Sequence, residues 1–325
     1  MAIGMHESQG LRGSGEGLEP FRALMAQADA RIELARACLM IARDAYPELD
    51  VAHYLGQIER FGLRLRAMAG QGGVEEKVIA LNEFMFVELG FEGNVDAYYD
   101  PRNSYLNEVI DRRTGIPISL SIVYIELGRR IGLPLEGVSF PGHFLVRLRL
   151  RGGVLVLDPF SGGAPQSEDD LRERLERVVP KGATGGIPLE ALPLEQFLEP
   201  ASHRQILARV LRNLKSIYRD ADEPAKLLDV LNRILVVTPD AGADLRDRGL
   251  LYQRLECWRP ALADLAAYLE REPDAPDAED LRLQLMALRA PCARMNGAAP
   301  GAAAASARLS ARRSKIAQSH YNSAF

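Results

Sequence analysis

The chain has 325 residues, of which 47% are hydrophobic and 26% are charged, and its formal net charge is -4. This balance gives no reason to expect nucleic acid or an anionic membrane as a partner. No stretch approaches 18 uninterrupted apolar residues, so the sequence predicts no membrane-spanning helix. Three dispersed cysteines, Cys38, Cys257 and Cys292, cannot form a full disulfide framework. Together with the absence of a signal-peptide pattern, they favour a cytoplasmic location.

The N-terminal third predicts a small helical bundle. Residues 1–18 are polar and Gly-rich, which is typical of a disordered tail. From Phe21 onward the apolar residues recur with helical spacing, and Cys38 falls on one apolar stripe, so we interpret it as a core residue. Asp50 is a candidate N-cap for a second helix. A third helix follows the Gly-rich break at 70–73.

A dense set of polar side chains follows in residues 94–115. We expect one short helix there, capped by Asn103 or Ser104. Its charged and amide side chains either form surface caps and ion pairs or make a rim that holds a neighbouring site in place.

The next helix is expected to begin near Pro117, because proline suits the first helical position. Ser119 then lies in the first turn, where unpaired backbone N–H groups and the helix dipole favour negative charge or a bound oxyanion. Ser121 points roughly 200° away around the helix, so only one serine can face a given partner. We favour Ser119 as the functional hydroxyl, although either serine can instead bond nearby backbone.

Two β-type runs, GVSFPGHFLVRLRL and VLVLDPF, are joined by Arg-Gly-Gly and predict a hairpin. If the register pairs Asp158 with Leu145 or Arg147, then His143 and Asp158 lie on the same face, because side chains alternate with period two. A one-residue slip would separate them. In a His–Asp pair the carboxylate orients the ring and stabilises its cation, whereas a lone strand histidine is usually structural.

The C-terminal half begins with a segment, 166–200, that is rich in Gly, Pro and charge and predicts a linker with one short helix at 167–178. From residue 201 the chain repeats itself. A shift of 34 residues superposes five pairs of like residues, which are Tyr218 on Tyr252, Leu228 on Leu262, Leu231 on Leu265, Leu235 on Leu269 and Pro239 on Pro273. This period is typical of tetratricopeptide repeats, whose concave surfaces hold peptide segments.

We therefore expect helical repeats over residues 201–290 that pack on the core and bind a protein or peptide partner. The final segment, 291–325, is Ala-rich and basic and predicts a disordered tail.

The motifs DPRNSYLNEVIDRRTGIPISLS, VSFPGHFLVR and LDPF closely resemble the SirB-type proteins, which have a transglutaminase-like core followed by tetratricopeptide repeats. The resemblance covers about residues 30–290. It implies an α+β fold in which a mainly helical bundle and a papain-like core with a small antiparallel sheet occupy residues 19–165, before the repeats. Transglutaminase-like enzymes place a cysteine at a helix start and a histidine and an aspartate on two following strands.

The resemblance implies that His143 and Asp158 occupy the positions of the histidine and the aspartate of these enzymes. The cysteine position falls at Ser119 or, with another gap placement, at Pro117 or Ser121.

Two functional hypotheses follow. No cysteine lies between Cys38 and Cys257, so the core lacks thiolate chemistry, which favours a non-catalytic protein-binding scaffold, a pseudoenzyme. The alternative is a serine-based amide hydrolase or acyl transferase with Ser119 as nucleophile, His143 as base and Asp158 as orienting group. The five histidines show no ligand spacing and no Gly-rich phosphate loop follows a strand, so we expect neither a metal nor another cofactor.

Overall fold

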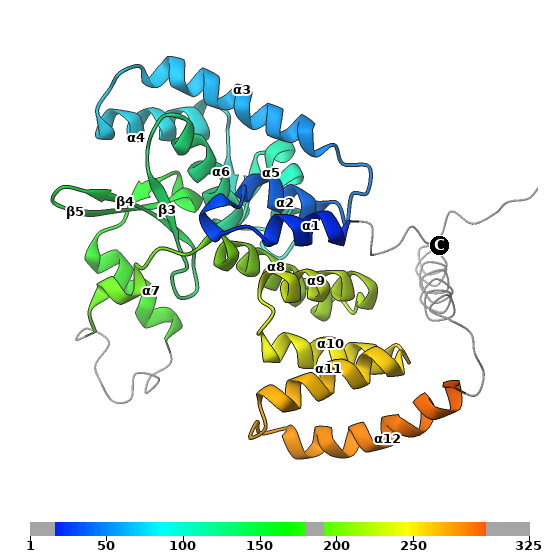
Figure 1. Ribbon diagram of the computed structural model, residues 1–325. Helices are drawn as coiled ribbons and strands as arrows, with labels where there is room; N and C mark the ends of the chain where they lie inside the picture. The colour runs from blue at the N-terminus through cyan, green and yellow to red at the C-terminus, as the bar shows by residue number, and fades with distance from the viewer. Residues whose placement is uncertain (1–16, 180–191, 297–325) are drawn as a thin grey trace, which may run out of the picture. The chain divides into compact units, whose positions relative to one another are not determined.

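The computed structural model describes residues 17–179 and 192–296 (Figure 1). Its contacts divide the chain into two compact units, one of residues 21–217 and one of residues 218–325 together with 1–20. Most of the two tails expected to be disordered lies outside the described residues, so that expectation stays a prediction.

The first unit is mainly helical and is built around α6 (Pro117–Arg130), which is buried without interruption from Pro117 to Gly128. Helices α2 (Leu34–Ala42), α3 (Val51–Ala69) and α4 (Val74–Asn82) pack against α6, and Figure 1 shows α3 and α4 side by side. Asp50 caps α3 as predicted, because its side chain accepts from the N–H groups of Ala52 and His53. The other helical elements that precede the sheet are α1 (Leu18–Met25), η1 (Asp29–Arg31), the π-helix η2 (Glu83–Glu88), η3 (Pro101–Asn103) and α5 (Leu106–Arg112).

A four-stranded antiparallel sheet in the order β3-β4-β5-β6 completes this unit. The predicted hairpin is formed by β4 and β5, and its register pairs Val146 with Leu157, which puts Asp158 opposite Leu145. This is one of the two registers that place His143 and Asp158 on the same face. The strands are β3 (Leu135–Val138), β4 (Leu145–Leu150), β5 (Gly153–Asp158) and β6 (Ala164–Pro165), and a separate parallel pair joins β1 (Glu92–Gly93) to β2 (Thr114–Gly115).

The segment after the sheet also contributes to the core of this unit. The helix predicted at 167–178 is α7 (Glu168–Val178), which follows the 3-10 turn η4 (Pro159–Ser161) and the strand β6. Its Leu171 and Leu175 pack with Leu194 of η6 (Leu194–Phe197) and with buried residues of the sheet. These side chains bury apolar surface, although the segment as a whole is rich in charge.

The second unit is a row of helices that lie side by side in chain order (Figure 1). Helices α9 (Pro224–Val237) and α11 (Trp258–Arg271) start and end 34 residues apart, which matches the predicted repeat period. Leu231 and Leu265, which the repeat superposes, are both fully buried. The other helices of this unit are α10 (Gly242–Arg254) and α12 (Ala278–Asn296). Helix α8 (His203–Asp220), most of which belongs to the first unit, joins the two units in sequence.

The fold is thus α+β, with a mainly helical first unit, a small antiparallel sheet and a helical repeat unit, as predicted from the sequence. In residues 17–179 and 192–296, no helix is both long and apolar enough to cross a membrane.

Candidate functional site

The hairpin brings His143 and Asp158 into direct contact. The Nε2 atom of His143 lies 3.0 Å from Oδ1 of Asp158. The Asp158 carboxylate is fully buried, whereas the His143 side chain is 13% exposed. His143 stands just before β4 and is fixed by its backbone N–H, which donates to the carbonyl of Phe140 at 3.0 Å. The pair therefore has a buried anion and a ring that reaches solvent.

The Asp158 carboxylate accepts hydrogen bonds from three groups besides His143. Its carboxylate also accepts from Arg174 Nη2 at 2.7 Å, from Ser161 Oγ at 3.0 Å and from the Phe160 N–H at 3.0 Å. Burial alone would raise the pKa of Asp158, but the hydrogen bond and charge of His143, the charge of Arg174 and the Ser161 hydrogen bond lower it below its ordinary value. The carboxylate is thus an ionised hub that joins β5, η4 and α7.

Ser119 is engaged with the backbone at the start of α6. Its Oγ donates to the carbonyl of Asn103 at 2.6 Å, lies 3.1 Å from the carbonyl of Ile116, and accepts from the Ile116 N–H at 3.0 Å. A hydroxyl has one proton to donate, and here it points to backbone oxygen. Ser119 is 2% exposed, and within the described residues it forms no hydrogen bond with His143 or Asp158.

The two other candidates for the cysteine position differ from Ser119. Pro117 is the first residue of α6 and has no side-chain nucleophile. Ser121 is fully buried, and its Oγ forms no hydrogen bond within the described residues. These contacts differ because the two serines point to different sides of α6.

Replacing each serine by alanine is expected to give opposite results. Ser119→Ala should lower the free energy of unfolding by about 1–2 kcal/mol, because it removes a buried side-chain acceptor at a helix start. Ser121→Ala should be neutral or stabilising by up to about 1 kcal/mol, because it removes a buried hydroxyl without a partner. Urea unfolding monitored by circular dichroism measures both. Equal losses would show that Ser119 does not stabilise the start of α6.

The structure identifies two positioning residues that the sequence patterns did not single out for these roles. Asn103 is fully buried and lies 16 residues before Ser119. Its backbone carbonyl accepts the hydrogen bond that the Ser119 hydroxyl donates. Neither Asn103 nor Ser104 caps α5, whose N-cap is Tyr105, so that expectation was wrong. Arg174, which binds Asp158, stands in a charged helix where it resembles the other surface arginines, so no local signal marks it.

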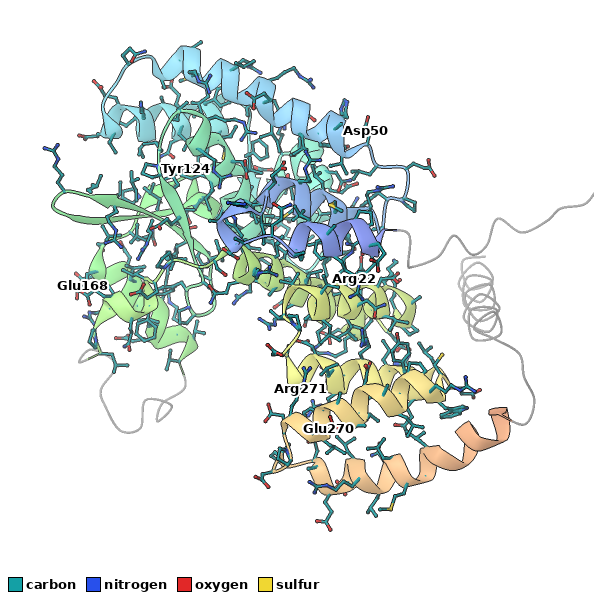
Figure 2. All side chains as sticks on the ribbon, in the orientation of Figure 1. Arg22, Asp50, Tyr124, Glu168, Glu270 and Arg271 are labelled. Atoms are coloured by element: carbon teal, nitrogen blue, oxygen red, sulfur yellow. The ribbon has the colours of Figure 1, made fainter. Side chains whose placement is uncertain are left out.

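A second network fixes the turn after Asp158. Tyr124 of α6, labelled in Figure 2, donates its hydroxyl proton to Asn82 Oδ1 at 2.7 Å, and Asn82 Nδ2 donates to the Gly163 carbonyl at 3.1 Å. The Gly163 N–H in turn donates to the Asp158 carbonyl at 2.9 Å. Gly163 has a φ of +76°, and a Cβ there would lie 2.1 Å from Asn82 Oδ1, so only glycine fits. The Asp158 backbone is therefore tied to α4 and α6.

Among the described residues, no group of three or more His, Cys, Asp or Glu side chains is placed to hold a metal ion. Cys38 lies in the core as expected, and burial raises the pKa of its thiol.

Comparison with known proteins identifies both parts of the chain. Residues 52–212 match the transglutaminase-like superfamily, and residues 214–286 match the tetratricopeptide repeat. A UPF0162 protein of Xylella fastidiosa (strain Temecula1) is 44% identical over 80% of this chain and 91% of its own length. The chain belongs to the SirB-type, or UPF0162, family.

Two further likenesses are more distant. Protein SirB1 of Salmonella typhimurium is 29% identical over 74% of this chain and 83% of its own length. A crystal structure of menin, reported to reveal its binding site for Mixed Lineage Leukemia (MLL) protein, covers 78% of this chain and 69% of its own. Its identity is 10% and its TM-score is 0.37. At that TM-score the likeness to menin carries no argument about function.

Proposed function

We propose that this SirB-type protein is a non-catalytic, protein-binding scaffold, a cytoplasmic pseudoenzyme whose transglutaminase-like core lacks a nucleophile. The single observation that carries the proposal is the state of Ser119. Its hydroxyl is buried, donates to the Asn103 carbonyl at 2.6 Å and accepts from the Ile116 N–H at 3.0 Å. A serine nucleophile must instead donate its proton to a general base. The sequence supplies no cysteine between Cys38 and Cys257 to replace it.

The partner-binding part of the proposal rests on the repeats. Tetratricopeptide repeats generally mediate protein–protein interaction, because their stacked helices form a surface that holds a peptide segment. Residues 214–286 match this repeat, and the described helices α9–α12 follow one another in a row. We infer that a protein or peptide partner binds within residues 201–290, and that neither nucleic acid nor a membrane is the main partner.

A serine-based amide hydrolase or acyl transferase is the second candidate, favoured by the 3.0 Å contact between His143 Nε2 and Asp158 Oδ1. In this alternative Ser119 would have to exchange its backbone partners for His143 when substrate binds.

Two measurements on the full chain separate the candidates. A serine-directed fluorophosphonate probe should label the wild type no more than it labels Ser119→Ala or His143→Ala. Labelling that disappears in both variants would overturn the non-catalytic proposal.

The second measurement places the partner. A photo-crosslinking residue at Leu250 or Gln253 of α10, both half-buried, should capture a defined protein. The matched control is Leu63 of α3, which is exposed and lies outside the repeats. Capture from Leu63 but from neither α10 position would contradict binding by the repeats.

A further inference from the structure

Four aromatic rings run from the surface to the His143–Asp158 pair. The ring centroid of Tyr99 lies 5.3 Å from that of Tyr98, which lies 6.3 Å from Phe160, which lies 6.0 Å from His143. All three contacts are edge-to-face, with interplanar angles of 74–80°. Tyr99 is 76% exposed at the outer end, whereas the His143 side chain at the inner end is mostly covered. We call these four residues the aromatic strip.

The strip is held in place by its surroundings. The buried Asn103 amide donates to the carbonyls of Ala97 at 2.7 Å and Tyr98 at 3.3 Å, which fixes the loop that carries the tyrosines. Phe160 packs so closely on Gly93 that a Cβ there would lie 2.6 Å from the ring. A ligand would therefore meet rings that are already ordered, which reduces the entropy lost on binding.

The strip also offers hydrogen bonds. Neither the Tyr98 nor the Tyr99 hydroxyl has a hydrogen-bond partner among the described residues, so both can donate to a ligand. At the inner end Nε2 of His143 lies 3.0 Å from Oδ1 of Asp158, so the carboxylate holds the ring in place.

Charges of both signs lie near the strip: the positive charge of Arg209 acts on Tyr98, whereas the segment that carries the tyrosines has exposed carboxylates. Glu92 and Asp96 are exposed on the segment that leads to Tyr98, and neither forms an ion pair within the part of the chain that the structure describes. The next carboxylate, Asp100, is already paired with Arg102 at 2.6 Å. A bound segment with a basic residue near Asp96 would therefore gain favourable electrostatic energy.

We propose that the aromatic strip binds an extended, proline-containing segment of a partner protein that carries a basic residue beside its prolines. A polyproline II segment forms no internal hydrogen bonds, so its carbonyls are free to accept from the tyrosine hydroxyls. Its rise is about 3.1 Å per residue, so each ring-to-ring step corresponds to about two residues. Prolines pack well on aromatic faces, and the segment loses little entropy because it is already extended. This site lies on the core and is separate from the partner site proposed for the repeats.

Isothermal titration calorimetry with the full chain tests the proposal. The probes are three synthetic peptides long enough to cover the four rings: a proline-rich peptide with two arginines, the same peptide with glutamates in place of the arginines, and one with glycines in place of the prolines. The arginine peptide should bind tightest. Tyr99→Ala should weaken it at least about tenfold, because it removes an exposed aromatic anchor. Asp96→Asn should abolish the preference for arginine over glutamate.

The matched control is Val87→Ala, which truncates an equally exposed apolar side chain of η2 and should leave binding unchanged. The proposal is overturned if the wild type binds none of the peptides, if Tyr99→Ala binds as tightly as wild type, or if the glycine peptide binds equally well. Sedimentation that shows a dimer lost in Tyr99→Ala would assign the strip to a second copy of the chain instead.

Discussion

Asp158→Asn should unfold the first unit at markedly lower urea concentration, with a loss of about 3–5 kcal/mol, the range found when one partner of a buried ion pair is removed. The physical reason is that Arg174 and His143 lose their common acceptor inside the protein, while the new amide directs a donor at them. Far-UV circular dichroism follows the whole chain, and the single tryptophan, Trp258, follows the second unit alone. The shift should appear in the dichroism and not in the Trp258 fluorescence.

Glu173→Gln on α7 is the matched control. Glu173 pairs with Arg177, and both side chains are more than 60% exposed. This change should alter stability by less than about 0.5 kcal/mol, because solvent screens exposed pairs. A loss of similar size in Asp158→Asn and Glu173→Gln would contradict the role of Asp158 as a buried hub.

The effect of Asp158 should also depend on pH. Because its folded-state pKa is lowered, its stabilising contribution is present above the unfolded-state pKa of about 4 and is lost as the pH falls through the folded-state pKa. The difference in stability between wild type and Asp158→Asn should therefore be constant near neutral pH and shrink in acid. Urea unfolding of both proteins over a pH series measures this. A difference that grows in acid would show that the pKa is raised instead.

Asp264→Ala should destabilise the repeat unit by about 2–3 kcal/mol, somewhat below the range for a fully buried pair because both partners keep some exposure. Arg248 of α10 binds the Asp264 carboxylate of α11 with two hydrogen bonds, at 2.6 and 2.7 Å. The same guanidinium donates to Asn232 of α9 at 2.9 Å, so the cluster ties three successive helices. Here the Trp258 fluorescence transition should move to lower urea concentration.

The control for the repeat unit is Asp222→Asn. Asp222 pairs with Arg254, and both side chains are more than half exposed. Its φ of +53° is tolerated by asparagine, so the change removes the charge without backbone strain. The Trp258 transition should stay within about 0.5 kcal/mol of wild type. If Asp264→Ala behaves like this control, the cluster does not stabilise the repeats.

The local elements of this protein are determined by its sequence. Apolar spacing after Pro117 predicted α6, the Arg-Gly-Gly turn predicted the β4–β5 hairpin, and a shift of 34 residues predicted the repeats. The helix and repeat signals are periodic, because helices and stacked repeats bury one face at a fixed spacing, whereas the turn signal is local. Period two showed which registers would bring His143 and Asp158 to the same face, but it could not select among the possible registers, and the structure supplies the pairing of Val146 with Leu157.

Only the tertiary structure decided what these side chains do. Ser119 donates to a carbonyl 16 residues away, and Asp158 binds an arginine 16 residues further along the chain. Asn103 matched the pattern of a helix cap, but its amide is buried and holds the loop that carries Tyr98. Hydrogen-bond partners are set by the distance and direction between packed elements, which composition and periodicity do not specify. The sequence by itself determined which elements form and which family they build, whereas packing decided that the Ser119 proton points to backbone and that the His143 ring ends an aromatic strip.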